Sequence, residues 1–408
     1  MKKPHTVFII LFLINLFNYI DRQAVYAVLP LIQADIHLSD TQAGWLASAF
    51  MIVYMLAALP IGYWADRYGR VLWISLGSGL WSLATGLSAF CGNFAALFSA
   101  RAAVGIGESC YGAISPSFVC EQYPPEKSGM VMALFSLAIP VGSALGYMGG
   151  GILGQKYGWR SAFLILGIPG LILAALASRL TDPKNSIPLK SKETEKSVRK
   201  NLGLLFSIPS YALATFSGAA ITFALGGFAV WIPSFFHRQW GLSVGKAGIT
   251  FGAITVLSGI IGTYFGGWLS QRLLKITPKS YFLISGLGLF IGMPLAILSL
   301  SASRFSSALW LLFISEIFLF LNMGPLNAII VTVTPLSERS LAFGANMLII
   351  HGLGDAISPT LIGYVSDQSG LKMALIGASL TLGLGAILCL WGMKYYKKDA
   401  DRFSLELI

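Results

Sequence analysis

The sequence predicts an all-α membrane protein with twelve transmembrane helices in two six-helix halves. Three observations lead to this prediction. Of the 408 residues, 55% are hydrophobic and only 11% are charged, whereas soluble domains carry about 25% charged residues. Twelve apolar stretches approach or exceed the roughly 20 residues that a membrane-spanning helix needs. In addition, two short sequence patterns recur at about half the chain length.

The apolar stretches place the spans in order along the chain. We expect them at residues 6–31, 42–64, 71–91, 94–121, 128–153, 159–179, 210–236, 245–270, 280–301, 305–335, 340–364 and 370–394. The longest polar stretch follows span six and is rich in Lys, Ser and Thr, as solvated linkers are. We therefore predict an N-terminal bundle at 1–180, a cytoplasmic linker at 181–204, and a C-terminal bundle at 205–408 that ends in a short cytoplasmic tail.

The recurring patterns predict that the two halves arose by duplication. Residues 62–70 (GYWADRYGR), after span two, are echoed 205 residues later by residues 267–275 (GWLSQRLLK), after span eight. Residues 158–162 (GWRSA) are echoed 212 residues later by residues 370–374 (GLKMA). Repeats of six spans are common in transporters, whose substrate sites lie near the midplane between the repeats.

The basic residues predict the orientation in the membrane. Of the 28 Lys and Arg residues, 20 fall on the side that holds both termini, six on the opposite side and two within spans. Because Lys and Arg collect in cytoplasmic loops, we expect cytoplasmic termini and do not interpret the net charge of +11 as nucleic-acid binding. The short loops are of prokaryotic size, so we expect a bacterial inner (plasma) membrane.

Four charged residues inside spans are the main candidates for function. Asp21 and Arg22 lie in span one, and Arg101 and Glu108 lie seven residues apart, on one face of span four. Charges within a membrane are costly and usually mark a partner or a transport path. We expect Arg22 to pair with Glu108, and Asp21 or Glu108 to change protonation during a transport cycle. The alternative is a purely structural, neutralised pair.

Other residues are candidates with a structural alternative for each. Arg101 could hold an anionic substrate head, because a guanidinium binds phosphate or carboxylate through two hydrogen bonds, or it could be a structural partner. Tyr19 and Tyr111 could line an amphipathic cavity or belong to the core. Glu316 in span ten is a lone buried acid, which we count with the substrate-binding candidates.

A histidine and an acid in span eleven form a further candidate pair. His351 and Asp355 are four residues apart and share a helix face. Histidine titrates near neutral pH, so the pair could take part in proton coupling. A hydrogen bond that only packs helices is the alternative.

The pattern Gly-x-x-x-Asp-Arg-x-Gly-Arg at residues 62–70 resembles the signature of the major facilitator superfamily. The resemblance implies the major facilitator fold, two pseudo-symmetric bundles that alternate in access, and a gate formed by Asp66, Arg67 and Arg70. Ordinary positive-inside charge is the alternative for these three residues. A narrower resemblance, to the spinster family, rests on segments 18–22, 101–109, 138–147, 251–255, Glu316 with Asn322, and 351–359. Spinsters are facilitators of lysophospholipids and sphingoid lipids, some of them proton-coupled.

The resemblance implies a proton-coupled transporter of an amphipathic lipid such as a lysophospholipid, surrounded by membrane lipids. We expect a monomer, because one chain contains both halves. The main rival is a proton-coupled symporter of small organic anions such as sugar acids. A lipid-modifying enzyme needs a clustered catalytic or metal-binding set, whereas the four His and four Cys are scattered without ligand spacing. We therefore expect no enzymatic activity, no cofactor and no metal. A transport-inactive receptor is the remaining alternative.

Overall fold

The computed structural model describes residues 4–182, 202–335 and 338–404. The regular elements in these ranges are α-helices, without a strand among them, which confirms the all-α prediction for the described residues. Eleven helical segments are long and apolar enough to cross a membrane. The other predicted span, 94–121, corresponds to α4 (Phe94–Gly112) and α5 (Ser115–Cys120). α4 carries two charged residues, Arg101 and Glu108.

The described helices form two compact units. The first comprises Met1–Pro188, Ala229–Val256 and Pro359–Asp367. It contains α1 (Pro4–Ile36), α2 (Asp40–Tyr68), α3 (Arg70–Ser88), α4, α5, α6 (Pro125–Ser136), α7 (Ala138–Tyr157) and α8 (Trp159–Ala177), with the end of α10 (Pro209–Trp240), the start of α11 (Val244–Leu274) and most of α16 (Ser358–Ser369).

The second unit comprises Leu189–Phe228, Leu257–Ser358 and Gln368–Ile408. It contains α12 (Ser280–Ser301), α13 (Phe305–Phe320), α14 (Met323–Val333), α15 (Arg339–Leu353), α17 (Leu371–Gly392) and α18 (Tyr396–Ser404). The predicted division into 1–180, 181–204 and 205–408 uses consecutive segments of the chain, whereas each compact unit combines separate segments. The predicted division stays a prediction. Residues 183–201 of its linker lie outside the described residues.

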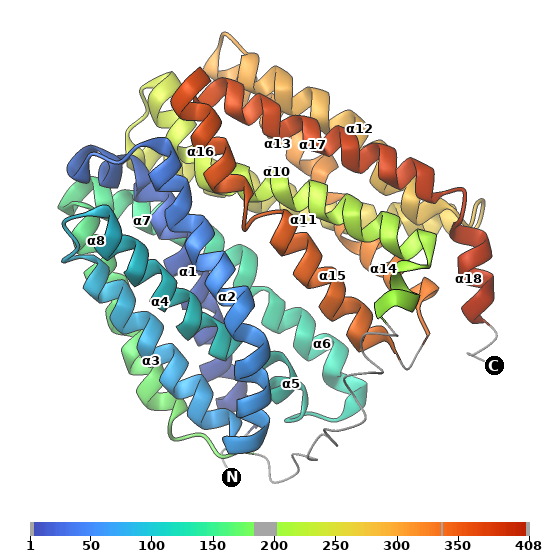
Figure 1. Cartoon of the computed structure of the whole chain (residues 1–408), viewed down its shortest axis with the longest axis horizontal. Coiled ribbons are helices and arrows are strands. Elements are labelled where there is room, and N and C mark those ends of the chain that lie inside the picture. Colours follow the sequence, from blue (N-terminus) through green and yellow to red (C-terminus); the bar gives the residue numbers. More distant parts are fainter. Residues whose placement is uncertain (1–3, 183–201, 336–337, 405–408) are drawn as a thin grey trace. The chain divides into compact units, whose positions relative to one another are not determined.

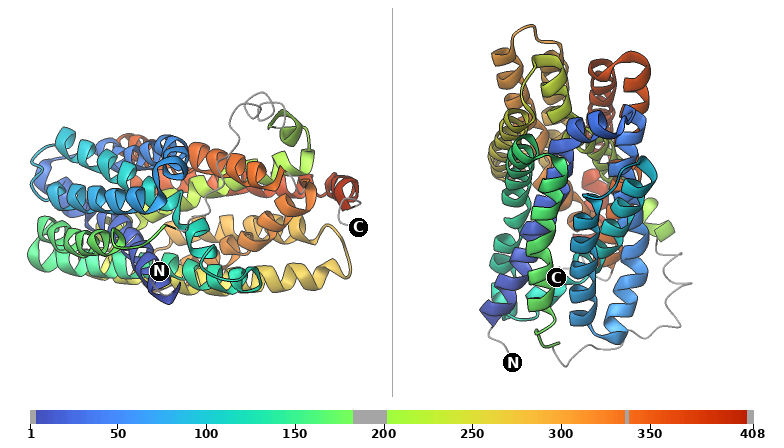
Figure 2. Two further views of the ribbon diagram at one scale, coloured as in Figure 1. Left: turned by 90° about the horizontal axis from the view of Figure 1, so that it is seen from below. Right: turned by 90° about the vertical axis from the view of Figure 1, so that its left-hand side faces the viewer.

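Within the first unit, long helices pack side by side (Figures 1 and 2). The most extensive contacts join α1 to α7, α3 to α8 and α4, and α2 to α4. In the second unit, α12 packs against α13 and α17, while α14 contacts α12 and α18. Both charged helices of the sequence analysis, α1 and α4, therefore lie within one compact unit.

A row of glycines on α7 lets α1 approach closely. Gly142, Gly146 and Gly150 recur every four residues and face α1. A Cβ added at Gly142 would lie 2.6 Å from the Leu16 carbonyl oxygen, and one at Gly146 only 2.5 Å from that of Ile20. Backbone contact of this kind is how small residues support helix packing in membranes. It fixes α1 at the turn that carries Asp21 and Arg22.

Glycines on α4 likewise allow close backbone contact, here with α2 and α3. A Cβ at Gly105 would lie 2.6 Å from the Phe50 carbonyl oxygen on α2. One at Gly107 would lie 2.6 Å from the Trp81 backbone nitrogen on α3. Glu108 follows directly, so its position is set by backbone contacts of α4 with α2 and α3.

Four predicted spans are interrupted, and each interruption precedes a proline. The breaks lie between α4 and α5, between α6 and α7, between α13 and α14, and between α15 and α16. A proline ring clashes with the carbonyl of the residue four positions earlier. For Pro116, Pro140, Pro325 and Pro359 that residue is Gly112, Ser136, Leu321 and Asp355, each at its break. The broken spans are the fourth and fifth of each predicted half, as a duplicated six-span unit predicts.

The second recurring sequence pattern has a common backbone conformation in both copies. Gly158 precedes α8 with φ 84° and ψ 154°, and Gly370 precedes α17 with φ 83° and ψ 152°. A positive φ is readily adopted only by glycine, which lacks a Cβ. The matched glycines therefore make the same tight connection, in agreement with an ancestral repeat.

Gly146→Ala tests whether backbone contact positions α1. The added methyl group meets the Ile20 carbonyl, so we expect the free energy of unfolding to fall by about 1–3 kcal/mol, the usual effect of overpacking. Gly149→Ala on the same helix is the matched control, because no atom lies within 4 Å of its added Cβ. Thermal unfolding of both variants in mild detergent measures the difference; equal stability of the two would contradict the packing account.

Candidate functional site

The four charged residues expected from the sequence gather in the first unit. Asp21, Arg101 and Glu108 expose 2%, 1% and 0% of their surface. Arg22 Nη2 lies 2.7 Å from Glu108 Oε2, which confirms the expected ion pair. Arg101 Nη1 lies 3.8 Å from Asp21 Oδ2 in a second, longer pair. We call Asp21, Arg22, Arg101 and Glu108 the charge cluster.

The geometry of two helices explains why the cluster forms two pairs. Adjacent residues point about 100° apart on a helix, so Asp21 and Arg22 face different partners. Arg101 and Glu108 lie two turns apart on α4, or about 10 Å along its axis. Each residue of α1 therefore reaches the opposite charge on α4. Pairing is required here, because a buried charge without a partner is strongly destabilising.

Aromatic rings surround the guanidinium groups. The Arg22 Cζ lies 4.7 Å from the ring centre of Phe50, 5.1 Å from that of Tyr19 and 5.7 Å from that of Tyr54. The Arg101 Cζ lies 5.1 Å from the same Phe50 ring. Contacts of this kind stabilise a cation in a partly desolvated place. Tyr19 was a candidate from the sequence, whereas Phe50 was not, because a Phe within an apolar span has no distinguishing pattern.

A threonine of α3 completes the surroundings of Asp21. The Thr85 hydroxyl donates a hydrogen bond of 2.8 Å to Asp21 Oδ2. Thr85 is itself buried. The sequence analysis did not identify it, since only the packing of α3 beside α1 and α4 brings it to the acid.

Arg101 and Tyr111, two candidates of the first unit, differ in whether their polar atoms are hydrogen-bonded. The Arg101 guanidinium is buried, yet Nε, Nη1 and Nη2 make no hydrogen bond to any described residue. Such a group can accept an incoming anion without first losing a strong bond. Tyr111 is buried beside Trp81, and its hydroxyl donates to the Leu11 carbonyl oxygen at 2.6 Å. Its hydroxyl therefore already stabilises the contact between α4 and α1.

The second unit contains the remaining intramembrane candidates. The Ser258 hydroxyl donates to Glu316 Oε2 at 2.8 Å, and both residues are buried. His351 Nδ1 lies 3.0 Å from Asp355 Oδ1. His351 lies in the last turn of α15, and Asp355 lies within the break between α15 and α16, where Pro359 prevents a continuous helix. The contact expected from the four-residue spacing is thus present, but Asp355 lies beyond the end of α15 and the two residues do not share a continuous helix.

The predicted gate lies at the end of α2 and is described only in part. Arg67 is exposed, with its Cζ 5.8 Å from the ring centre of Tyr68. Arg70 Nη1 lies 2.6 Å from Glu121 Oε1, a partner that the sequence did not suggest. The Asp66 side chain lies outside the described part of the structure. The gating role of these residues stays a prediction.

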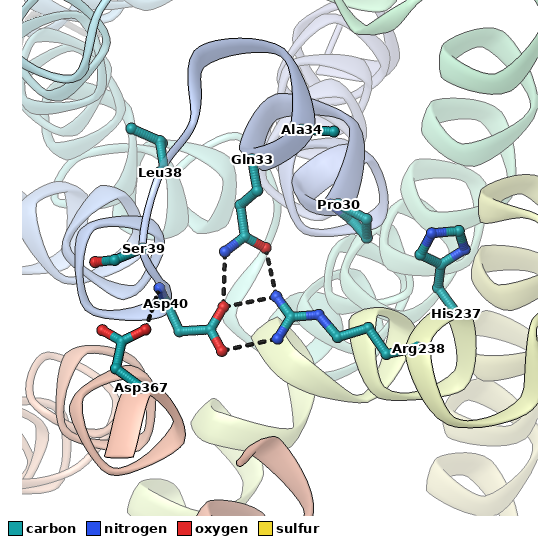
Figure 3. A pocket seen from close by; sticks show the side chains of 9 residues that line it. All are labelled: Pro30, Gln33, Ala34, Leu38, Ser39, Asp40, His237, Arg238 and Asp367. Carbon is teal, nitrogen blue, oxygen red and sulfur yellow. Dashed lines mark hydrogen bonds and ion pairs between the residues drawn. The ribbon is translucent and has the colours of Figure 1, made fainter. Parts of the chain in front are cut away.

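A second polar network lies in the first unit around Asp40 (Figure 3). Arg238 makes two bonds to the Asp40 carboxylate, of 2.6 and 2.7 Å, and Gln33 bonds to both residues. Asp367 accepts hydrogen bonds from the backbone nitrogens of Asp40 and Thr41, at the start of α2. The network borders an open cavity of about 420 Å³. It ties α1, α2, α10 and α16 together at one end of the unit.

The described residues contain no group of three or more His, Cys, Asp or Glu side chains that could hold a metal ion. The four cysteines are not joined in disulfides.

The sequence matches the model of the family described as Major Facilitator Superfamily over residues 11–359. It is 33% identical to Protein spinster homolog 1 of Xenopus tropicalis over 384 residues, which cover 89% of this chain and 73% of that protein. It is 32% identical to the Sphingosine-1-phosphate transporter SPNS2 of Danio rerio over 400 residues, or 92% of this chain and 79% of that one.

A solved structure shows a similar fold. The crystal structure of a bacterial homolog to the human lysosomal transporter Spinster, in an inward-facing and unoccupied conformation, superimposes with a TM-score of 0.86. The match covers 98% of this chain and 99% of the other at 23% sequence identity. At that identity the likeness shows the fold alone.

A double-mutant cycle on Arg22 and Glu108 tests whether the pair is energetically coupled. Removing one partner of a buried pair leaves an uncompensated charge, so we expect Arg22→Gln to lower the free energy of unfolding by about 3–5 kcal/mol. Adding Glu108→Gln should recover part of that loss, with a coupling of about 0.5–3 kcal/mol. Unfolding by sodium dodecyl sulfate in mixed micelles provides the measurement.

The control for this cycle is Asp35→Asn, also on α1. Asp35 forms an exposed pair with Arg160, with both side chains more than 40% exposed. Exposed pairs contribute about 0–1 kcal/mol, so this variant should remain close to the wild type. Strictly additive effects of Arg22→Gln and Glu108→Gln would show that the 2.7 Å contact contributes nothing.

Proposed function

The chain is a transporter of the major facilitator superfamily and belongs to its spinster family, and on this premise we propose that it moves an amphipathic lipid, such as a lysophospholipid, across the membrane in a proton-coupled cycle of alternating access. The membership confirms the resemblance drawn from residues 62–70 and from the spinster-like segments. The major facilitator fold is likewise confirmed by the structural match. The family is one of transporters and not a class of enzymes.

The charge cluster is the single observation that carries the proton-coupling proposal. Two carboxylates and two guanidiniums lie together, so their formal charges balance. Asp21, Arg101 and Glu108 are buried, and the Arg22 side chain is 15% exposed. In a low-dielectric interior, a proton that neutralises one acid leaves one guanidinium with excess positive charge. That excess is reduced either by release of the proton or by arrival of an anion. Protonation and anion binding at the cluster are thereby linked.

Arg101 is the residue that we propose binds the anionic head. Its guanidinium makes no hydrogen bond to the described residues, and a guanidinium binds phosphate in a two-point contact. Among the described residues, the acid within salt-bridge range of Arg101 is Asp21, at 3.8 Å. Neutralising Asp21 would release Arg101 for a phosphate. Arg22, held by Glu108 and three aromatic rings, would then act as a fixed neighbouring charge.

The similarity to a lipid phosphate transporter supports an amphipathic cargo. The relative from Danio rerio is named a transporter of sphingosine-1-phosphate. We propose the same chemical class here: an anionic head near the charge cluster, close to Tyr19, and a hydrocarbon tail along apolar surface. In the second unit, Glu316 is proposed to contact the substrate, and His351 and Asp355 are proposed to take part in proton coupling. Tyr111 is proposed to line the site, while its hydroxyl stays hydrogen-bonded to the Leu11 carbonyl oxygen.

Orientation and gating complete the proposal. We propose cytoplasmic termini in a bacterial inner membrane, from the 20 basic residues on the side of the termini. Asp66, Arg67 and Arg70 are proposed as a cytoplasmic gate, and the segments 1–180 and 205–408 as the two halves that move. We further propose that a monomer is sufficient, since one chain contains both halves.

Flux of a fluorescent lysophospholipid into proteoliposomes tests this function. We expect a pH gradient to stimulate flux in the wild type. In Asp21→Asn, which mimics a permanently protonated acid and cannot release its proton, flux should become independent of the gradient. Asp35→Asn removes an exposed acid of α1 and should respond like the wild type. Protein-free liposomes provide the background rate.

The outcomes distinguish the rival functions. Lysophospholipid flux that ignores the gradient in the wild type would leave a lipid facilitator and remove the coupling role of the buried acids. No lysophospholipid flux, together with gradient-driven uptake of a small organic anion such as a sugar acid, would favour the symporter. No flux of either substrate in folded protein would favour a receptor without transport activity.

A further inference from the structure

Asp21 receives a hydrogen bond from a helix that the charge pairs do not involve. Thr85 lies in the last turn of α3 and donates to Asp21 Oδ2 at 2.8 Å. The same oxygen is the one that lies 3.8 Å from Arg101 Nη1. The hydrogen bond is thus the shortest polar contact that the structure gives to this acid. The other oxygen, Asp21 Oδ1, is buried and makes no hydrogen bond to a described residue.

A hydroxyl group is suited to follow the protonation of its neighbour. It carries one hydrogen to donate and two lone pairs to accept. Facing an ionised Asp21, Thr85 donates, and the 2.8 Å contact fits this arrangement. Facing a neutral Asp21, it can accept the carboxyl proton and turn its own hydrogen to the Trp81 carbonyl four residues earlier in α3, a bond that buried Thr side chains in helices often make.

We propose that Thr85 is a positioning residue of the proton site: it orients the Asp21 carboxyl and reverses its hydrogen bond when that carboxyl gains or loses a proton. Through this reversal, α3 responds directly to the protonation of Asp21. Because α3 packs closely on α4 and α8, the change is passed to helices that do not carry Asp21. The inference rests on the proposed function, in which Asp21 takes part in the proton cycle.

Other charged groups also act on Asp21 and must be kept constant in a test. Arg101 and Glu108 approach it from α4, and Arg22 is its neighbour on α1. The side of α7 that faces this turn of α1 presents glycines. Thr85 is the polar partner from α3. Its removal therefore changes one contact of Asp21 without altering a formal charge.

The test is an infrared pH titration of the purified protein in nanodiscs, without substrate. The carbonyl stretching band of protonated Asp21 is identified as the band that Asp21→Asn removes. In Thr85→Val, which keeps the shape and loses the hydroxyl, we expect the midpoint of this band to move by about one pH unit to higher pH. The variant loses the hydrogen bond in both protonation states, but the bond to the ionised carboxylate is the stronger one, so the ionised form is destabilised more. The size of the shift corresponds to the usual strength of such bonds.

Two variants make the result specific to the Thr85 hydroxyl. Thr85→Ser keeps the hydroxyl and should titrate like the wild type. Ser88→Ala removes a buried hydroxyl from the same helix whose bond is to its own Ala84 carbonyl, at 2.8 Å, and should also titrate like the wild type. A shift in Ser88→Ala equal to that in Thr85→Val would overturn the proposal, since any loss of a hydroxyl from α3 would then suffice.

The remaining outcomes separate this proposal from the function on which it rests. An Asp21 band with the same midpoint in wild type and Thr85→Val overturns the positioning role and leaves proton-coupled transport intact. Absence of any titrating Asp21 band in the wild type overturns both this role and that of Asp21 as a proton carrier. Lysophospholipid flux would still test transport itself, independently of Thr85.

Discussion

The structure of the first unit depends on the need to pair charges that are buried within a membrane-spanning fold. An isolated buried charge is strongly destabilising, so α1 and α4 must lie where their charges meet. The glycines of α7 bring backbone against α1. Those of α4 bring it against α2 and α3. The result is a 2.7 Å pair between Arg22 and Glu108 and a 3.8 Å pair between Arg101 and Asp21. The close packing of the helices therefore brings the charged side chains within pairing distance.

The inequality of the two pairs has a functional consequence. Arg22 is held by a short ion pair and by three aromatic rings. Arg101 has a long contact with Asp21 and no hydrogen bond to the described residues. Neutralising Asp21 therefore disturbs fewer contacts than neutralising Glu108, which would break the short pair. We infer that the Asp21 side of the cluster is where binding of a proton favours binding of an anionic head, while the Glu108 side keeps α1 and α4 together.

The fold could largely be predicted from the sequence, because the length of each apolar stretch and the internal repeat are properties of long segments and do not depend on single contacts. The pairing of Arg22 with Glu108 followed from helix geometry. The breaks were not predictable from proline alone: Pro116 and Pro359 interrupt their spans, whereas Pro169 and Pro233 lie inside continuous helices. Thr85, Phe50 and the network around Asp40 were also missed. Each acquires its role from the packing of helices distant in sequence, and none belongs to a local pattern that distinguishes it from ordinary residues of a span.

The measurement that tests the central claim most directly is proton uptake or release when substrate binds. Purified protein in weakly buffered detergent solution is mixed with lysophospholipid, and a pH indicator dye follows the free proton concentration. If an anionic head and a proton act on the same buried charge cluster, binding must change the number of bound protons, as linkage requires. The account predicts proton uptake in the wild type and none in Asp21→Asn combined with Glu108→Gln. Saturable binding without a proton change in the wild type, or an unchanged signal in the double variant, would contradict it.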